Sequence, residues 1–415
     1  MAGVVHVDVV SSLRSVDPAE WDALGSAAGL YTSHTWLLGD EGDPAADVSY
    51  LLARDGSGAL VGGLACYRPR VTGNERYNLR VLLGREDVPR SRALLLAGSR
   101  SGYRCDVPVS GRLSPTEASG VRTRLLREAA EHAARDGRQA VLLYVPGHAY
   151  TQLAADTGSR GAPVCSDATF SLPGGSFADW LGAQPYKKRL KIRHELEAYD
   201  ASGWRTEAVP LGAVIDDVVP LVAALQDKHG ALAHPRALAR LLARQEQAFG
   251  DRAIAFTGRL HGQIGAFALA YRHADILHMR MAGVNYDLAP ETAYALFNVM
   301  YYAPITHAYA TGARAVHLGP GSLHTKVLRR ARLTSLWALP IGWTWPDGAT
   351  AGAARQATDE LRAEIGDQAA RHFTDTADPL LPELQPDPAK HSLQVGRHQV
   401  CPHGISSPWP KRPEN

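Results

Sequence analysis

The fold is decided by residues 253–281, which read AIAFTGRLHGQIGAFALAYRHADILHMRM. Aliphatic, β-branched and aromatic residues dominate three short runs, and such runs are typical of strands. They predict strands at residues 253–257, 264–271 and 276–281. The segment 260–263, which contains Gly262, predicts a tight turn between the first two. This part of the chain is therefore a β-hairpin followed by a third strand.

A helix is predicted to follow these strands, at residues 290–309, with a kink at Pro304 because proline cannot donate a backbone hydrogen bond. Gly312 ends the helix, and the apolar run 315–318 predicts a further strand. The order of elements in the second half of the chain is hairpin, strand, helix, strand.

The first half of the chain has a similar order. Residues 50–54 and 60–67 flank a turn at 55–58 and predict a hairpin. Residues 114–117, Ser-Pro-Thr-Glu, combine an N-cap, a first-turn proline and a capping-box glutamate, so a helix is expected up to Gly137, followed by a strand at 140–145. Two copies of one order predict a duplicated α/β protein in which each domain is a mixed β-sheet flanked by helices.

The length of 415 residues indicates two or three domains. We expect an N-terminal domain at 1–170 and a second domain at 171–346, which contains a basic helix at 186–202. Residues 347–415 are expected to hold one helix and then a proline-rich stretch, loosely ordered from Asp375 onward.

Composition excludes several classes of protein. The chain is 45% hydrophobic and 21% charged with a net charge of +2, so general polyanion binding is not implied, although a local basic patch is compatible with it. The four cysteines are far apart, and Cys401 and His403 lack a second ligand pair, so neither a disulfide framework nor a metal site is predicted. The N-terminus does not read as a signal peptide and no apolar run is long enough to span a membrane, which predicts a cytoplasmic protein.

The clearest chemical motif is residues 319–330, GPGSLHTKVLRR, directly after the strand at 315–318. Glycines allow backbone N–H groups to approach a ligand, and Lys326, Arg329 and Arg330 supply positive charge, so the segment suits an oxyanion or a phosphate. The alternative is an amphipathic segment whose charges only face water.

Alternation along the strand at 276–281 places His278 and Arg280 on one face, together with Ile276 and Ala282. An unperturbed histidine has a pKa of about 6.5, which suits a general base at neutral pH. His278 is therefore a candidate base, with a purely structural histidine as the alternative.

Polar and aromatic residues around the start of the following helix are candidates for lining a substrate cleft. They are Tyr286, Asp287, Tyr294 and Asn298. Tyr294 and Asn298 are four residues apart and are expected on one helix face. For Tyr294, a half-buried core position is the alternative.

The basic helix reads YKKRLKIRHEL at residues 186–196. Ile192, Leu196 and Tyr199 share one face, which leaves five clustered cations as candidate phosphate contacts for a nucleic acid: Lys187, Lys188, Arg189, Lys191 and Arg193. The absence of interleaved exposed aromatic residues favours the alternative, a solvated basic helix.

Three segments together resemble the Fem-like branch of the GNAT superfamily, in particular the tandem-GNAT proteins of peptidoglycan biosynthesis or recognition. They are residues 61–75, the helix at 187–193 and the Pro-Gly segment with its lysine and arginines at 320–330. The resemblance covers roughly residues 20–345 and implies two tandem GNAT-like domains. Two departures are Ala331, where the family usually has glycine, and Thr325, which separates His324 from Lys326.

The resemblance implies an acyltransferase that moves an aminoacyl group to an amine of a cell-wall precursor or small natural product and forms an amide bond. Aminoacyl-tRNA would be the co-substrate, and no other cofactor is implied. The segment 283–291 has one glycine and two carboxylates, so it is a poor pyrophosphate cradle, which favours tRNA over acyl-CoA. The alternatives are an acyl-CoA-dependent N-acyltransferase and a non-catalytic protein that recognises a peptidoglycan-like ligand. The oligomeric state is left open.

On this resemblance Lys326 stabilises the oxyanion and His278 deprotonates the attacking amine. The remaining residues of the predicted second-domain site would bind donor or acceptor. They are Arg280, Tyr286, Asp287, Tyr294, Asn298, Gly321, His324, Arg329 and Arg330.

Overall fold

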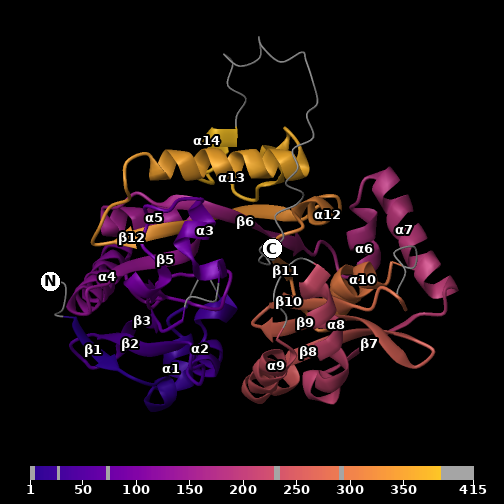
Figure 1. Cartoon of the computed structure of the whole chain (residues 1–415), viewed down its shortest axis with the longest axis horizontal. Helices are drawn as coiled ribbons and strands as arrows, with labels where there is room; N and C mark the ends of the chain where they lie inside the picture. The colour runs from indigo at the N-terminus through magenta and orange to yellow at the C-terminus, as the bar shows by residue number, and fades with distance from the viewer. Residues whose placement is uncertain (1–4, 26–28, 72–74, 229–233, 289–293, 385–415) are drawn as a thin grey trace, which may run out of the picture. The chain divides into compact units, whose positions relative to one another are not determined.

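The computed structural model describes residues 5–25, 29–71, 75–228, 234–288 and 294–384. These residues form two compact units (Figure 1). Unit 1 combines residues up to Asp167 with the segment from Leu333 onward, and unit 2 is Ala168–Arg332. The first boundary lies close to the expected residue 170, whereas residues 333–346, expected in the second domain, group with unit 1.

Unit 1 is built on a mixed sheet with the order β1-β2-β3-β4-β5-β12. These strands are β1 (His6–Val10), β2 (Ala46–Arg54), β3 (Leu60–Pro69), β4 (Leu94–Ala97), β5 (Gln139–Pro146) and β12 (Arg332–Ile341). The first four pair antiparallel, β4 and β5 pair parallel, and β12 pairs antiparallel with β5. The predicted hairpin of β2 and β3 is confirmed, and β4 is a strand that the sequence analysis did not predict.

The longest helix of unit 1 begins where its capping signals predict. The unit contains α1 (Pro18–Asp22), α2 (His34–Asp40), α3 (Leu79–Leu83), α4 (Pro115–Arg135), α5 (Gly147–Thr157), α13 (Ala349–Ile365) and α14 (Leu381–Leu384). At the start of α4, the Ser114 side chain accepts from the Glu117 N–H, and the Glu117 carboxylate accepts from the Ser114 N–H. The buried face of α4 packs so closely on β3 that a Cβ at Gly62 would lie 2.6 Å from Val121.

Unit 2 repeats the same strand arrangement. Its strands are β6 (Ala162–Ser171, which crosses the unit boundary), β7 (Arg205–Pro210), β8 (Ala253–Leu260), β9 (Gln263–His273), β10 (Ile276–Val284) and β11 (Ala315–Pro320). From β7 to β10 the pairs are antiparallel, and β10 pairs parallel with β11. Because four antiparallel strands and a parallel partner occur in both units, the predicted tandem α/β organisation is confirmed.

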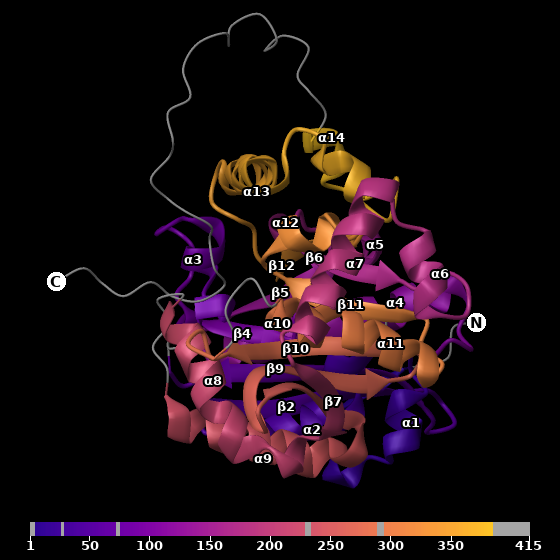
Figure 2. The ribbon, with the colours of Figure 1, turned by 90° about the vertical axis from the view of Figure 1, so that its right-hand side faces the viewer.

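The helices of unit 2 cover its sheet (Figure 2). They are α6 (Phe177–Gly182), α7 (Tyr186–Ala201), α8 (Ile215–Lys228), α9 (Pro235–Phe249), α10 (Ala295–Phe297), a π-helical turn (Asn298–Tyr302), α11 (Ala303–Ala310) and α12 (Leu323–Val327). Just before Pro304, where a kink was expected, the chain forms this π turn, in which the Ala303 N–H donates to the Asn298 carbonyl five residues back. The predicted helix start at 290 lies outside the described residues.

Residues 375–384 were expected to be loosely ordered, and this was wrong. The Asp378 carboxylate is buried and accepts from the N–H of Ser335 at 3.0 Å, from the Ser335 hydroxyl at 2.5 Å and from the N–H of Leu380 at 3.0 Å. A buried carboxylate needs such donors, and Ser335 on β12 provides two of them. The rest of the proline-rich stretch, with Cys401 and His403, lies outside the described residues.

No helix in the described ranges is long and apolar enough to cross a membrane.

Candidate functional site

The candidate site of unit 2 lies where its two parallel strands separate. β10 and β11 pair over three positions only, Ile276–His278 against Ala315–His317. Beyond them β10 remains paired with β9 up to Val284, while β11 runs on to Pro320. Carbonyl groups that leave a strand ladder must find other donors, so this end of β11 is a place where side chains or a ligand are needed.

Lys326 supplies those donors. Its ammonium is buried and donates to the carbonyls of Leu318 at 3.0 Å, Gly319 at 2.8 Å and Pro320 at 3.3 Å. An ammonium has three N–H groups, so three carbonyls match its donors. Lys326 therefore fixes the turn after β11 and places a positive charge inside it. To serve as an oxyanion donor, the ammonium would have to exchange one of these carbonyls for the oxyanion.

The turn itself has an unusual backbone. Gly319, Gly321 and Ser322 all have left-handed φ angles, of 66°, 82° and 49°. Glycine adopts this region at little cost, but serine does so only when its surroundings hold it there. Ser322 is held by the start of α12, where its carbonyl accepts from the Thr325 hydroxyl at 2.9 Å.

His278 and Arg280 do not follow the predicted alternation, because β10 contains a bulge between Met279 and Met281. A bulge inserts one residue, here Arg280, and shifts all later side chains to the opposite face. Met281 and Gly283 therefore share the His278 face, and the placement of Ala282 beside His278 was wrong. His278 is buried and lies opposite His317 on β11, with 5.3 Å between the ring centroids.

Arg329, predicted as a phosphate contact, lies in a buried network. Its guanidinium donates to the Glu195 carboxylate of α7 at 2.6 Å and to the Tyr302 hydroxyl at 2.9 Å. The Tyr302 hydroxyl in turn donates to Glu195, and the Phe297 ring lies 4.4 Å from the guanidinium carbon. Burial lowers the pKa of Arg329, but Tyr302 and Glu195 outweigh burial and the pKa is raised overall. The network joins the basic helix to the segment that follows Lys326.

The neighbouring residues of the motif are more accessible. Arg330 is exposed, has a left-handed φ of 64°, and donates to the carbonyl of Ala183. His324 is exposed on α12, and Gly321 is half-buried in the turn. Of the three cations in this motif, Arg330 alone presents an exposed side chain.

Tyr294 and Asn298 are close together, but not as one helical face. Tyr294 precedes α10 and has a left-handed φ of 52°, and its carbonyl accepts from both the N–H and the side-chain amide of Asn298. The Tyr294 ring stacks on Phe297. The expectation that both lie on one face of the helix was therefore wrong.

Tyr286 and Asp287 lie just after β10. Tyr286 is exposed, and the Lys228 ammonium lies 3.5 Å from its ring centroid. Asp287 is exposed, and its N–H donates to the Asn285 side chain. Part of the predicted pyrophosphate-loop position, residues 289–291, lies outside the described residues.

The side chains of the basic helix α7 differ in their exposure, and one exposed aromatic residue among them was not expected. Lys187, Lys191 and Arg193 are exposed, and Lys188 is half-buried. Arg189 is also half-buried and donates to the carbonyls of Gly182 and Gln184 at the end of α6. Two apolar side chains, Tyr186 and Leu190, are 66% and 43% exposed among these cations. The expected lack of exposed aromatic residues was wrong, since Tyr186 begins the helix.

Three residues of this site, Glu195, Tyr302 and Tyr186, were not predicted from the sequence. Glu195 could have been noticed as an acidic residue on the apolar face of a basic helix. It comes three residues after Ile192 and four before Tyr199.

The comparisons with known proteins agree with this architecture. Residues 186–327 match the sequence profile of the family described as Acetyltransferase (GNAT) domain. This match assigns a GNAT-type domain to residues 186–327, which lie within unit 2. The two repeated units fit a tandem arrangement of this fold, and the chain shares its fold with the following solved structures.

FemX shares the fold with a TM-score of 0.54 and 11% sequence identity, over 80% of this chain and 96% of that chain. A conserved protein of unknown function from Bacteroides thetaiotaomicron has a TM-score of 0.51 and 11% identity, over 81% of this chain and 100% of that one. L-PGS from Bacillus licheniformis has a TM-score of 0.50 and 11% identity, over 82% and 96%. No curated protein is similar enough in sequence to be matched to this chain.

Proposed function

We propose that this protein transfers an aminoacyl group from aminoacyl-tRNA to an amine of a cell-wall precursor or of a small natural product. The observation that carries the proposal is the Glu195–Arg329 ion pair, because it ties the exposed basic helix α7 to the segment that bears Lys326. A polyanionic donor bound on α7 would thus have its acyl end directed by a fixed connection toward the Lys326 turn. The fold shared with FemX is compatible with this chemistry.

In the proposed reaction the acceptor amine attacks the ester carbonyl carbon, and a tetrahedral oxyanion forms. Collapse of this intermediate breaks the C–O ester bond, and the proton lost by nitrogen ends on the ribose oxygen of the departing tRNA. Lys326 provides the positive charge for the oxyanion. His278 is the proposed proton acceptor. Because His278 is buried beside His317, the proton would have to be passed to it through intervening hydrogen-bonding groups.

Exposed α7 residues supply the proposed tRNA surface. From Tyr186 to His194 the helix has no acidic residue, so no carboxylate offsets the cations of its first half. Lysine and arginine contacts to phosphate release counterions, and an exposed aromatic ring can stack on an unpaired base. Arg330 would add a phosphate contact.

An acyl-CoA-dependent N-acyltransferase is the second candidate, and the match of residues 186–327 to the GNAT acetyltransferase profile favours it. The test is binding of the full-length protein to aminoacylated and deacylated tRNA across a salt series, with acetyl-CoA titrated in parallel. Salt-sensitive tRNA binding without acetyl-CoA binding is the expected result. Acetyl-CoA binding alone would replace aminoacyl-tRNA by acyl-CoA as the donor, and binding of neither would leave a recognition protein.

Tyr186→Ala is expected to weaken tRNA binding by about 1 kcal/mol or more through loss of base stacking, without a change in the slope of log K against log salt.

Lys191→Gln is expected to weaken tRNA binding and to reduce the slope of log K against log salt by roughly 0.7 to 0.9. Filter binding at four or more salt concentrations measures both quantities. Arg127→Gln, which removes an exposed cation from α4 in unit 1, is the matched control and should change neither. An unchanged slope in Lys191→Gln would argue against α7 as the phosphate-binding surface.

A further inference from the structure

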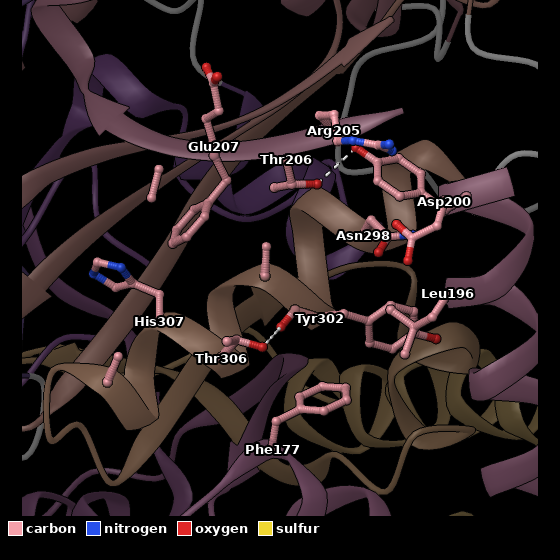
Figure 3. Close-up of a pocket in the computed structure, with 15 residues that line it drawn as sticks. Phe177, Leu196, Asp200, Arg205, Thr206, Glu207, Asn298, Tyr302, Thr306 and His307 are labelled. Carbon is pink, nitrogen blue, oxygen red and sulfur yellow. Dashed lines mark hydrogen bonds between the residues drawn. The ribbon is translucent and has the colours of Figure 1, made fainter. Parts of the chain in front are cut away.

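A pocket in unit 2 lies between the end of α7, the strands β7 and β8, and the helical segment at 298–310 (Figure 3). Its volume is about 480 Å³. Pockets of about 300 to 1,000 Å³ are typical of small-molecule sites. Apart from Asn298, none of the predicted site residues lines it.

The inner part of this pocket is apolar and aromatic. Phe256 and Tyr302 are buried in its floor, and Phe177 and Leu196 stand on the side of α6 and α7. The Phe177 and Tyr302 rings meet edge to face at 6.3 Å, so the wall is a packed surface and not a set of loose side chains. This part suits an aliphatic or aromatic group.

Two opposite charges stand at one end of the pocket. Asp200 lies near the C-terminal end of α7, and Arg205 is the first residue of β7 (Figure 3). Within the described ranges neither Asp200 nor Arg205 forms an ion pair, although Arg205 donates one hydrogen bond to the carbonyl of Trp204. The pKa of the Tyr199 phenol is raised to about 12, chiefly by burial. The hydrogen bond with Thr206 lowers this pKa, Asp200 raises it and Arg205 lowers it, so both charges act on the Tyr199 side of the pocket.

The third charged side chain of the rim is already engaged. The Glu207 carboxylate accepts from the Arg259 guanidinium at 3.1 Å. Asp200 and Arg205 are thus the pair available to a ligand, one for a cation and one for an anion. A carboxylate and an ammonium on one carbon atom are the groups that such a pair recognises together.

We infer that this pocket binds a zwitterionic ligand of the α-amino-acid class with an apolar side chain. The ligand's ammonium faces Asp200, its carboxylate faces Arg205, and its side chain lies against Phe177, Phe256 and Tyr302. The inference is independent of the proposed acyl transfer, because it requires neither tRNA nor Lys326.

The test is titration of the full-length protein, by calorimetry or ligand-observed NMR, with L-phenylalanine and L-leucine as probes. Phenethylamine lacks the carboxylate and hydrocinnamate lacks the ammonium, so each should bind at least tenfold more weakly than L-phenylalanine. L-Aspartate, which keeps the zwitterion but has a charged side chain, should not bind measurably. Absence of binding by both zwitterionic probes would overturn the inference, as would equal binding of phenethylamine or hydrocinnamate.

Variants locate the site. Asp200→Asn and Arg205→Gln are each expected to reduce affinity at least tenfold, and Ala303→Leu is expected to do so by filling the pocket. Asp251→Asn, which removes an exposed carboxylate of unit 2 that does not line the pocket, is the matched control and should leave affinity within twofold. Circular dichroism and thermal unfolding show whether each variant is folded. Wild-type affinity in folded Asp200→Asn and Arg205→Gln would place the probe elsewhere and refute the assignment.

Discussion

Lys326→Met is expected to reduce acyl transfer by about 10² to 10³-fold, the loss typical of removing one oxyanion donor. Methionine nearly preserves the length of the side chain but has no N–H group for the carbonyls of Leu318, Gly319 and Pro320. The measurement is single-turnover formation of the amide product from aminoacyl-tRNA and an acceptor amine. Unchanged turnover would refute the oxyanion role.

The same substitution has a structural effect that must be separated from the chemical one. Leaving buried carbonyls without donors costs about 1 to 3 kcal/mol per group, so the turn after β11 would be less stable. Acceptor and tRNA affinities distinguish the two effects. Retained affinities with lost turnover would assign a chemical role to Lys326, whereas affinities that fall together with turnover would leave it only the role of holding the turn. Lys326→Arg, which keeps the charge and the donors, is the matched comparison and should retain more activity than Lys326→Met.

Glu195→Ala is expected to lower the free energy of unfolding by about 3 to 5 kcal/mol, the range observed when one partner of a buried ion pair is removed. The Arg329 side chain is 6% exposed and that of Glu195 is 0% exposed, so the remaining guanidinium would be buried without its carboxylate. Urea unfolding followed by circular dichroism measures the change. A loss below about 1 kcal/mol would show that water or another carboxylate replaces Glu195.

The double variant Glu195→Leu with Arg329→Met gives an independent check. Replacing both partners of a buried pair with apolar residues of similar volume is often neutral, so the double variant should be more stable than Glu195→Ala. Glu197→Ala, an exposed acidic neighbour on α7, is the control and should change stability by less than about 0.5 kcal/mol. tRNA affinity of the folded double variant further tests whether the connection between α7 and the segment that follows α12 matters for function.

Local signals predicted part of the fold well. The start of α4 could be read from residues 114–117 because an N-cap serine, a first-turn proline and a capping-box glutamate act within one helical turn. The hairpin of β8 and β9 was equally local. The bulge at Arg280 was not predictable, because it depends on how β10 pairs with β9 and no residue type marks it.

Side-chain roles were harder to predict than elements. Arg329 and Arg330 are adjacent and chemically identical, yet the first is buried against Glu195 and the second is exposed. Their difference arises from the left-handed backbone at Arg330 and from helix α7, which is distant in sequence. The ordering of residues 375–384 likewise depends on a partner that is distant in sequence, Ser335. The proline-rich composition by itself predicted that these residues are loosely ordered.

The position of β12 has a consequence for biosynthesis. This strand pairs with β5 through Leu336 and Pro146, although all of unit 2 is translated between them. While the ribosome is still producing unit 2, β5 therefore presents an apolar strand edge that its final neighbour has not yet covered. Such edges attract other chains, so the nascent protein is most exposed to aggregation before residue 333 emerges, and a chaperone that shields β5 would act in that interval.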